Sequence, residues 1–444
     1  MSMNSNERRK IARRIFESAV ESVLPDRLIS TSVHLHNNVL HINDAVHQLQ
    51  PGQKVHVFGS GKASIGMAKG LLSILEERVA GGFIVSPSMS DEDLSPLTVV
   101  QGSHPVPDEK SIQGASFLID GMSRLSDDDF FIYLLSGGSS ALIEKPVTTI
   151  TLAEMQETTR LLLHNNVPIQ QINAVRKHLS MLKGGRLGQC TRASGIVLVI
   201  SDVIDDDLSV IGSGPLYYDT STYKQCREIL EQARIWDKIP SGVRAVIMSG
   251  AKGEIPETPK EQKSSISHYL LGTNLVALEH ARKTAAGYGF YSYIMTASLA
   301  GEAKEAAKVL AAIARNVSTH HDPFQPPVCL LFGGETTVTL TGKGKGGRNQ
   351  ELALAALAEI GRQNNILLLS GGTDGIDGNS SAAGAIADSG FFLEGVRQKL
   401  SIAQFLAENN SNAFFKAVGG LLETGPTGTN VMDITLIIID KEEL

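Results

Sequence analysis

The chain has 444 residues and a formal net charge of −7. This length favours two or three domains, and the absence of a basic excess argues against nucleic acid or an anionic membrane surface as a partner. The three cysteines are far apart and form no CxxC pair, so we expect neither a disulfide framework nor a zinc ribbon. No apolar run approaches the ~18 residues of a membrane span. We therefore expect a cytoplasmic protein.

The first predicted element is an amphipathic helix over residues 6–24. Its apolar positions include Ile11, Ile15, Phe16 and Val20, with charged residues between them. This spacing places one apolar stripe on a helix surface. The interspersed charges are not those of a signal peptide.

One unit then recurs along the chain: an apolar run of strand length, a turn of small residues, and a helical pattern. The first copy runs from Val55 to Phe58, through Gly59–Ser64, into a helical run from Ile65. Such alternation predicts parallel sheets covered by helices, with ligands at the carboxyl ends of the strands. The other turns follow the apolar runs 130–135, 196–200, 270–271, 328–332 and 366–369.

Two polar, proline-containing segments, 250–267 and 320–327, are candidate linkers. We divide the chain near residue 252, into a domain over 1–252 and a second α/β domain over 266–444. Each part is long enough for its own core. The default position for an active site is then the cleft between the two domains.

The turn Gly59-Ser-Gly-Lys62 combines a helix N-terminus with a lysine, a combination that favours an oxyanion. It is not a Walker P-loop, because His56 stands where a glycine is needed and Ala63 where Ser or Thr should follow the lysine. The alternative is a solvated lysine beside a structural turn.

Two acidic positions also follow predicted strands. Asp202 is suited to hold Mg²⁺ or to accept a proton from a hydroxyl, whereas the acids over 205–207 are interpreted as a helix start. Asp374 lies in a glycine-rich loop that would suit a cation or a nucleotide. The segment 103–108, which includes His104, is interpreted as a structural turn.

Three basic residues lie on predicted helices. Arg176 and Lys183 are seven residues apart in a helical run over 161–187, so they are expected to share a face, functional or merely solvated. Arg348 lies at a helix start after a glycine- and lysine-rich stretch and offers a planar fork to phosphate oxygens. The glycines at 342, 344 and 347 match GxGxxG, a weak signal that keeps a dinucleotide-dependent dehydrogenase as an alternative.

Nine motifs in this order resemble the class II glycerate kinases, the glycerate 2-kinase family, over nearly the whole chain. They are GSGKAS (59–64), SHPVPD (103–108), LSGGSSA (135–141), NAVRKHLS (173–180), KGGR (183–186), SDV (201–203), GGET (333–336), GGRNQE (346–351) and SGGTDG (370–375). The resemblance implies a Rossmann-like N-terminal domain and a C-terminal domain of the type called MOFRL.

The resemblance also implies a kinase that phosphorylates D-glycerate with ATP and Mg²⁺, giving 2-phosphoglycerate, with Lys62 and Arg348 as catalytic residues. Alternatives are an NAD(P)H-dependent hydroxypyruvate reductase and a non-catalytic two-lobed protein that binds an acidic metabolite. Partners are expected to be D-glycerate and the nucleotide, without nucleic acid or membrane; monomer or homodimer is left open. The predicted site comprises catalytic Lys62, Arg348 and Asp202; acceptor-binding Ser60, Gly61 and Arg176; nucleotide-binding Gly137, Gly138, Ser139, Ser140, Lys183, Asn274, Glu335 and Asp374; and metal-binding Asp202 and Asp374.

Overall fold

The computed structural model of the chain describes residues 3–90 and 92–441 and divides into two compact units. One unit comprises residues 28–271. The other joins the N-terminal segment, up to Arg27, to the chain from Gly272 onward. This division differs from the predicted ranges 1–252 and 266–444 chiefly at the N-terminus. Helix α1 (Ser5–Ser22) packs against α11 (Asn274–Gly287), so the apolar stripe seen in the sequence is buried in the C-terminal unit.

The unit over residues 28–271 is built on a six-stranded sheet in the order β6-β5-β4-β7-β8-β9. The four registered pairs, from β6 across to β8, are all parallel. In chain order this is the arrangement 3-2-1-4-5-6 of the Rossmann fold, whose switch point lies between the first and fourth strands. The strands are β4 (Val55–Ser60), β5 (Val79–Ser86), β6 (Leu97–Gln101), β7 (Phe130–Leu135), β8 (Ser194–Ile200) and β9 (Ile266–Gly272).

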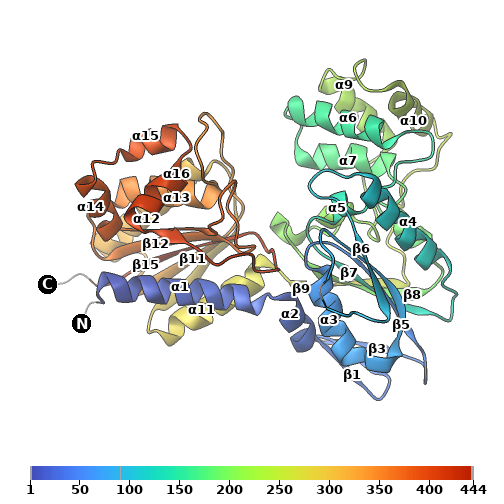
Figure 1. Cartoon of the computed structure of the whole chain (residues 1–444), viewed down its shortest axis with the longest axis horizontal. Helices are drawn as coiled ribbons and strands as arrows, with labels where there is room; N and C mark the ends of the chain where they lie inside the picture. The colour runs from blue at the N-terminus through green and yellow to red at the C-terminus, as the bar shows by residue number, and fades with distance from the viewer. Residues whose placement is uncertain (1–2, 91, 442–444) are drawn as a thin grey trace. The chain divides into compact units, whose positions relative to one another are not determined.

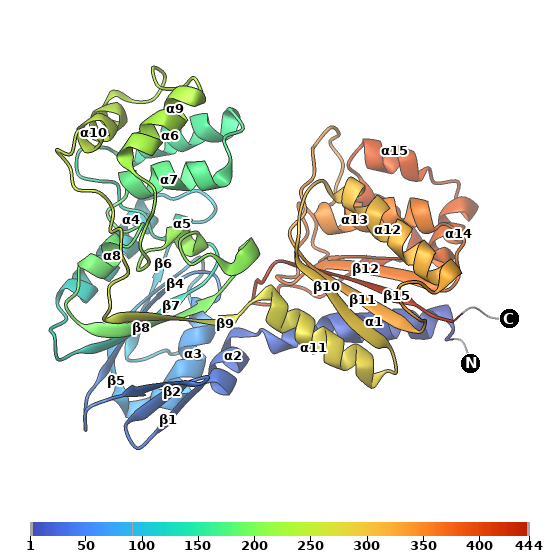
Figure 2. The same cartoon turned by 180° about the vertical axis from the view of Figure 1, so that it is seen from behind.

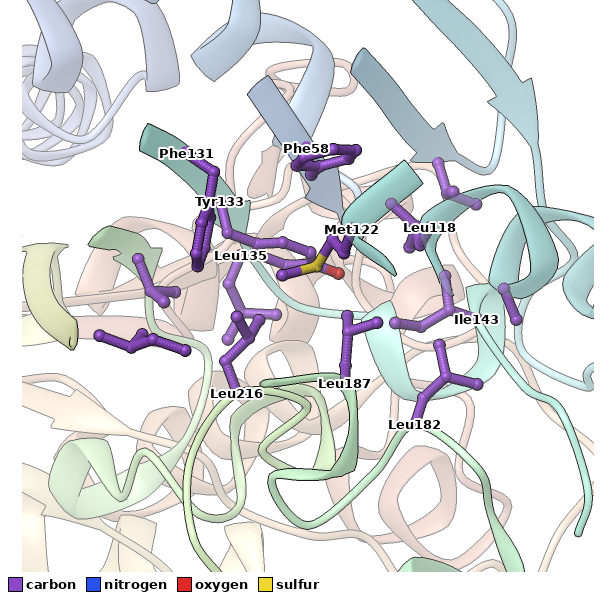
Figure 3. Close-up of a cluster of buried hydrophobic side chains, with 14 of the residues drawn as sticks. Phe58, Leu118, Met122, Phe131, Tyr133, Leu135, Ile143, Leu182, Leu187 and Leu216 are labelled. Carbon is purple, nitrogen blue, oxygen red and sulfur yellow. The ribbon is translucent and has the colours of Figure 1, made fainter. Parts of the chain in front are cut away.

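The main core of this unit lies between the sheet and the helices over its face (Figure 3). Phe58 and Tyr133 from the central strands pack with Leu118 and Met122 from α4. A separate antiparallel hairpin sheet comprises β1 (Val33–His36), β2 (Val39–Ile42) and β3 (Ala45–Gln48). The helices near the sheet are α2 (Pro25–Ser32), α3 (Ser64–Leu75), α4 (Glu109–Ser123), α5 (Ser139–Leu142) and α8 (Arg186–Gln189).

Four further helices form a layer with its own core in the same unit (Figure 1). The core includes Leu162, Val175 and Tyr223, all fully buried. Its helices are α6 (Leu152–His164), α7 (Ile169–Leu179), α9 (Tyr223–Gln232) and α10 (Ser241–Ala251). The predicted helical run over 161–187 is therefore interrupted, and Lys183 lies beyond the end of α7. It does not share a helix face with Arg176, contrary to the prediction.

The other unit contains a mixed six-stranded sheet in the order β10-β11-β15-β12-β13-β14. Only β10 and β11 pair in parallel; β15 is antiparallel to both of its neighbours. The fold class, two α/β domains, is confirmed, but this second sheet is not mostly parallel. A buried strand is a continuous apolar run whether it pairs in parallel or antiparallel, so the sequence did not distinguish the two kinds of pairing. The strands are β10 (Tyr291–Leu299), β11 (Val328–Gly334), β12 (Ile366–Gly372), β13 (Gly384–Asp388), β14 (Leu421–Leu422) and β15 (Asp433–Ile439).

Helices cover both faces of this mixed sheet. Helices α1 and α11 lie along one face, and α12 (Ala303–His320) and α13 (Arg348–Ile360) along the other (Figures 1 and 2). The remaining helices are α14 (Ser389–Arg397), α15 (Ile402–Ala407) and α16 (Ser411–Val418). Within the described residues, no helix combines the length and apolar character that crossing a membrane requires.

Candidate functional site

The turn after β4 lies at the carboxyl end of a parallel strand, as the sequence predicted, and the strand order places it at the switch point of the sheet. The Lys62 amide donates to the carbonyl of Gly137 (2.9 Å), which joins this turn to the one after β7. Gly61 has φ +132°, and a Cβ there would lie 2.1 Å from Ser136 Oγ. Only glycine fits this backbone and this contact. The Lys62 side chain is exposed at the mouth of the turn.

A chain of buried hydroxyl groups fixes the two turns together. Ser60 Oγ lies 2.7 Å from Tyr133 Oη and 2.6 Å from Ser139 Oγ. Ser60 and Ser139 are fully buried, so their hydroxyls shape the turn and present no surface to a ligand. Ser60 was predicted to bind the acceptor and Ser139 the nucleotide; their side chains instead position the backbone that carries Gly61 and Gly138.

Asp202, just beyond β8, lies against the same pair of turns. A Cβ on Gly137 would lie 2.0 Å from Asp202 Oδ2, so the carboxylate packs directly on the bare Cα of this glycine. Burial raises the pKa of Asp202 above its ordinary value, while a backbone hydrogen bond and the Lys62 charge act in the opposite direction. The structure thus brings Lys62, Gly137 and Asp202 together from three separate strand ends.

His104 also belongs to this cluster, although the sequence favoured a structural turn. A Cβ on Gly138 would lie 3.2 Å from both His104 Cδ2 and Lys62 Cγ, so the imidazole and the lysine stem flank one glycine. Burial and the Lys62 charge both lower the pKa of His104. Its imidazole is therefore neutral near pH 7.

Arg176 and Lys183 meet at a buried carboxylate that sequence reasoning missed. Lys183 Nζ donates to Glu144 Oε2 (2.7 Å) and to the carbonyl of Ile143 (3.0 Å). Arg176 lies 3.6 Å from the same Glu144 oxygen and donates to the carbonyl of Ser140 (3.0 Å). Burial lowers the pKa of Lys183 to about 8, against the attraction of Glu144.

Arg176 and Lys183 were both predicted to bind ligands, but these contacts leave them with different accessibility. Lys183 is fully buried, which leaves it no surface for the nucleotide it was assigned to; its amine neutralises Glu144 instead. The Arg176 side chain keeps 15% exposure and stays accessible. Ser140, whose hydroxyl lies 2.8 Å from Ser213 Oγ, connects Arg176 to the turn after β7.

The second cluster lies in the unit that contains the mixed sheet and is centred on Arg348, the first residue of α13. Its Nε and Nη2 donate to the two Asp433 oxygens (2.5 and 3.0 Å), and Nη1 donates to Glu335 (2.5 Å). Burial opposes its charge, but the bonds to Asp433 and the nearby carboxylates outweigh burial and raise the pKa. Arg348 and Glu335, which were predicted as separate site residues, lie together, and Asp433 was missed.

Asp374 lies beside Asp433 in this cluster, whereas Asn274 bonds to the backbone that carries Asp433. A Cβ on Gly372 would lie 3.1 Å from Asp374 Oδ1 and 3.4 Å from Asp433 Oδ1. Asn274 is buried and donates both amide hydrogens to the carbonyls of Val431 and Asp433 (2.8 and 2.9 Å). Asn274 was predicted to bind the nucleotide. Its side-chain amide instead fixes the backbone at the start of β15.

Asp377 anchors the first turn of α13 in place. Its two oxygens accept from the backbone amides of Asn349 (3.1 Å) and Gln350 (2.9 Å). Burial raises its pKa to about 6, although these hydrogen bonds act in the opposite direction. The contacts fix the helix start that presents Arg348.

The GxGxxG match does not form a dinucleotide turn. Cβ atoms on Gly342 and Gly344 would clash with the backbone at Glu408 and Asn410, and one on Gly347 would clash with Asp377. These glycines therefore allow close packing within the unit. The structure gives no support to a nicotinamide cofactor at this motif.

Neither cluster forms a complete metal site from protein side chains alone. Across residues 3–90 and 92–441, no three His, Cys, Asp or Glu side chains converge as a metal site. The Arg348 cluster nevertheless gathers carboxylates: Asp433 and Glu335 bond to the arginine, the Asp377 charge acts on it, and Asp374 flanks Gly372 together with Asp433. Mg²⁺ commonly binds through one or two carboxylates together with substrate phosphates. The donor set therefore fits an ion that arrives with a nucleotide.

Comparisons with known proteins match both units. Residues 11–248 match the family described as "Domain of unknown function (DUF4147)", and residues 328–433 match the MOFRL family. A glycerate 2-kinase of Pyrococcus horikoshii is 39% identical over 98% of each chain. A putative hydroxypyruvate reductase of Agrobacterium vitis is 34% identical over 99% of this chain and 96% of that one.

A solved structure extends the likeness to three dimensions. The crystal structure of a glycerate kinase from Thermotoga maritima superposes with a TM-score of 0.87 at 34% identity, covering 98% of this chain and all of that one. Full-length identity at this level, with the two family models in the same order, shows common descent. The chain therefore belongs to the glycerate kinase family, in which a DUF4147 domain precedes a MOFRL domain.

Proposed function

We propose that this protein transfers the γ-phosphoryl group of ATP to D-glycerate, with Mg²⁺, and forms 2-phosphoglycerate. The observation that carries the proposal is the meeting of Lys62, Gly137 and Asp202 at the switch point of a Rossmann-order sheet. Phosphoryl transfer needs chiefly positioning and positive charge around the transferred group. Names of relatives support glycerate as the acceptor.

In this proposal Lys62 stabilises charge on the transferred phosphoryl oxygens. Asp202 accepts the proton of the attacking hydroxyl. Its raised pKa makes it a stronger base than an exposed carboxylate. Arg348, held by Asp433 and Glu335, offers its remaining N–H groups to phosphate. When bound, Mg²⁺ would neutralise phosphate charge; Asp202 in one unit and Asp374 in the other are separate candidate ligands for it.

The test is an assay of the purified protein with Mg-ATP and D-glycerate, followed by ³¹P NMR of the product. We expect ADP only when D-glycerate and a divalent metal are both present, and 2-phosphoglycerate as the product. 3-Phosphoglycerate would correct the position of transfer. If NADH is oxidised with hydroxypyruvate and ATP is not consumed, the protein is a hydroxypyruvate reductase and the kinase proposal fails. The strand order alone is compatible with either activity.

Asp202→Asn is expected to raise the Mg²⁺ concentration needed for half-maximal activity by about tenfold or more, a change of about 1.4 kcal/mol. The amide lacks the hard anionic oxygen and cannot accept the proton. Asp205→Asn is the matched control, because Asp205 is exposed and its φ of 64° suits asparagine. An unchanged magnesium titration and kcat in Asp202→Asn would remove this residue from the site.

A further inference from the structure

A cavity of about 620 Å³ lies between the loop at residues 105–107 and helices α6 and α7. The loop is tied to α6, because Gln156 Nε2 donates to the carbonyl of Pro107 (2.7 Å). We refer to this cavity as the α6–α7 groove. Its volume falls within the range of roughly 300–1,000 Å³ that is typical of small-molecule sites.

The walls of the α6–α7 groove are mostly apolar and open to solvent. Val106, Leu163 and Ile169 line it and are 62%, 58% and 53% exposed, respectively, and Met155 lies deeper. These exposures are high for large aliphatic side chains, and they occur together at one cavity. A ligand that covers them must itself have substantial apolar surface.

Polar side chains in the walls are already paired with protein groups. Thr159 Oγ1 donates to the Met155 carbonyl (2.9 Å), and Arg160 forms an ion pair with Glu157 (2.7 Å). The Arg176 guanidinium is different. Its neighbour Glu144 is neutralised by the fully buried Lys183, so the three groups keep one net positive charge, on the side where Arg176 is exposed.

Two lining residues connect the groove with the turns that carry Lys62 and Ser140. Its lining residue Pro105 follows His104, which flanks Gly138 beside Lys62. Arg176 also lines the groove and donates to the carbonyl of Ser140 in the turn after β7. A ligand with an apolar end in the groove would therefore place an anionic end at the turns that carry Lys62.

We propose that the α6–α7 groove holds the nucleoside of the ATP donor, with Arg176 on a phosphate oxygen. This inference rests on the proposed kinase function and assigns its donor subsite. Glycerate, a three-carbon acid that carries polar oxygens on every carbon, is too small and too polar for these walls. The purine base of ATP has apolar faces, and its triphosphate supplies the anionic end. Arg176 thereby moves from the acceptor, its predicted ligand, to the donor.

Ala153→Trp tests the assignment by filling the groove. Ala153 is an exposed lining residue of α6, so the larger side chain leaves the core intact. We expect the KM for ATP and the Kd of mant-ADP, a fluorescent ADP analogue, to rise about tenfold or more, equivalent to about 1.4 kcal/mol. The KM for D-glycerate should change less than twofold. Ala245→Trp is the matched control, an exposed alanine on α10 that does not line the groove.

Photolabelling with 8-azido-ATP gives a second measurement that needs no substitution. We expect labelled peptides from residues 105–107 and 152–172. Labelling over residues 335–374 instead, or a raised KM for D-glycerate alone in Ala153→Trp, would overturn the assignment. The mant-ADP titration involves no acceptor. If the wild type binds mant-ADP, Ala153→Trp weakens that binding and glycerate is not phosphorylated, the groove assignment stands and the proposed acceptor fails.

Discussion

Lys62→Ala is expected to lower kcat by roughly 10²–10³-fold or more, the loss typical of removing one preorganised charge-stabilising donor. The KM for D-glycerate and for ATP should rise far less, because the lysine acts on charge that develops during transfer. Folding should be preserved, since the side chain is exposed and its amide, not its amine, bonds to Gly137. Steady-state kinetics, with circular dichroism to check the fold, decide the matter.

Two further variants sharpen this prediction. Lys62→Arg should not restore activity, because the lysine stem is packed beside Gly138 and a planar guanidinium differs in shape from an ammonium point charge. Lys69→Ala is the control, since Lys69 is an exposed lysine of α3, the helix that follows the Lys62 turn, and it pairs with Glu92 (2.7 Å). A near-wild-type kcat in Lys62→Ala would exclude Lys62 from the chemical step.

The pH profile offers an independent readout of the Lys62–Asp202 contact. The Lys62 charge lowers the pKa of Asp202, against the effect of burial. Without that charge the pKa rises, so a base that must be ionised loses its proton only at higher pH. The acid limb of the residual kcat in Lys62→Ala should therefore shift to higher pH. A shift to lower pH would contradict the role of Asp202 as the proton acceptor.

Arg348→Ala is expected to lower kcat by a comparable factor, roughly 10²–10³-fold. It also leaves the carboxylate of Asp433, whose side chain is only 8% exposed, without its bidentate partner. Loss of one partner of a largely buried pair destabilises a protein by about 3–5 kcal/mol when burial is complete. The kinetic effect must therefore be measured below the unfolding transition of the variant, located by thermal denaturation.

Arg348→Lys separates the two effects, because it keeps a positive charge near Asp433 and Glu335 but loses the planar fork. We expect most of the stability to return and kcat to stay low. Arg362→Ala, an exposed position just beyond α13, is the control. If Arg348→Lys restores kcat together with stability, the guanidinium serves the fold of this unit and not phosphoryl transfer.

Local features of the site were predictable from the sequence. The strand, turn and helix around Lys62 follow from neighbouring residues, and the meeting of Gly137 with Asp202 follows from the common edge of parallel strands. The start of α13 at Arg348 is likewise a local signal.

Pairings set by distant parts of the chain were not predictable. The residue spacing predicted Lys183 on a helix face. No nearby residue indicates that Lys183 is buried in an ion pair with Glu144, 39 residues earlier in the chain. Asp433 precedes an apolar run, and such a run does not show whether its strand pairs in parallel or antiparallel. Asp433 meets Arg348 because β15 lies antiparallel between β11 and β12. His104 lies among prolines, a pattern that indicates a turn and hides its contact with Gly138.

The packing of α1 has a consequence for biosynthesis. Arg8 pairs with Asp440 and Arg9 with Asp388, so α1 bonds to segments that are synthesised 432 and 379 residues after these arginines. At about 5–20 residues per second, the delay is on the order of 20–80 seconds. The apolar stripe of α1 lacks its main partner until α11 has been made, and it lacks β12 and β15 for longer. Nascent chains stalled before α11 should therefore be the species that chaperones bind and that aggregate.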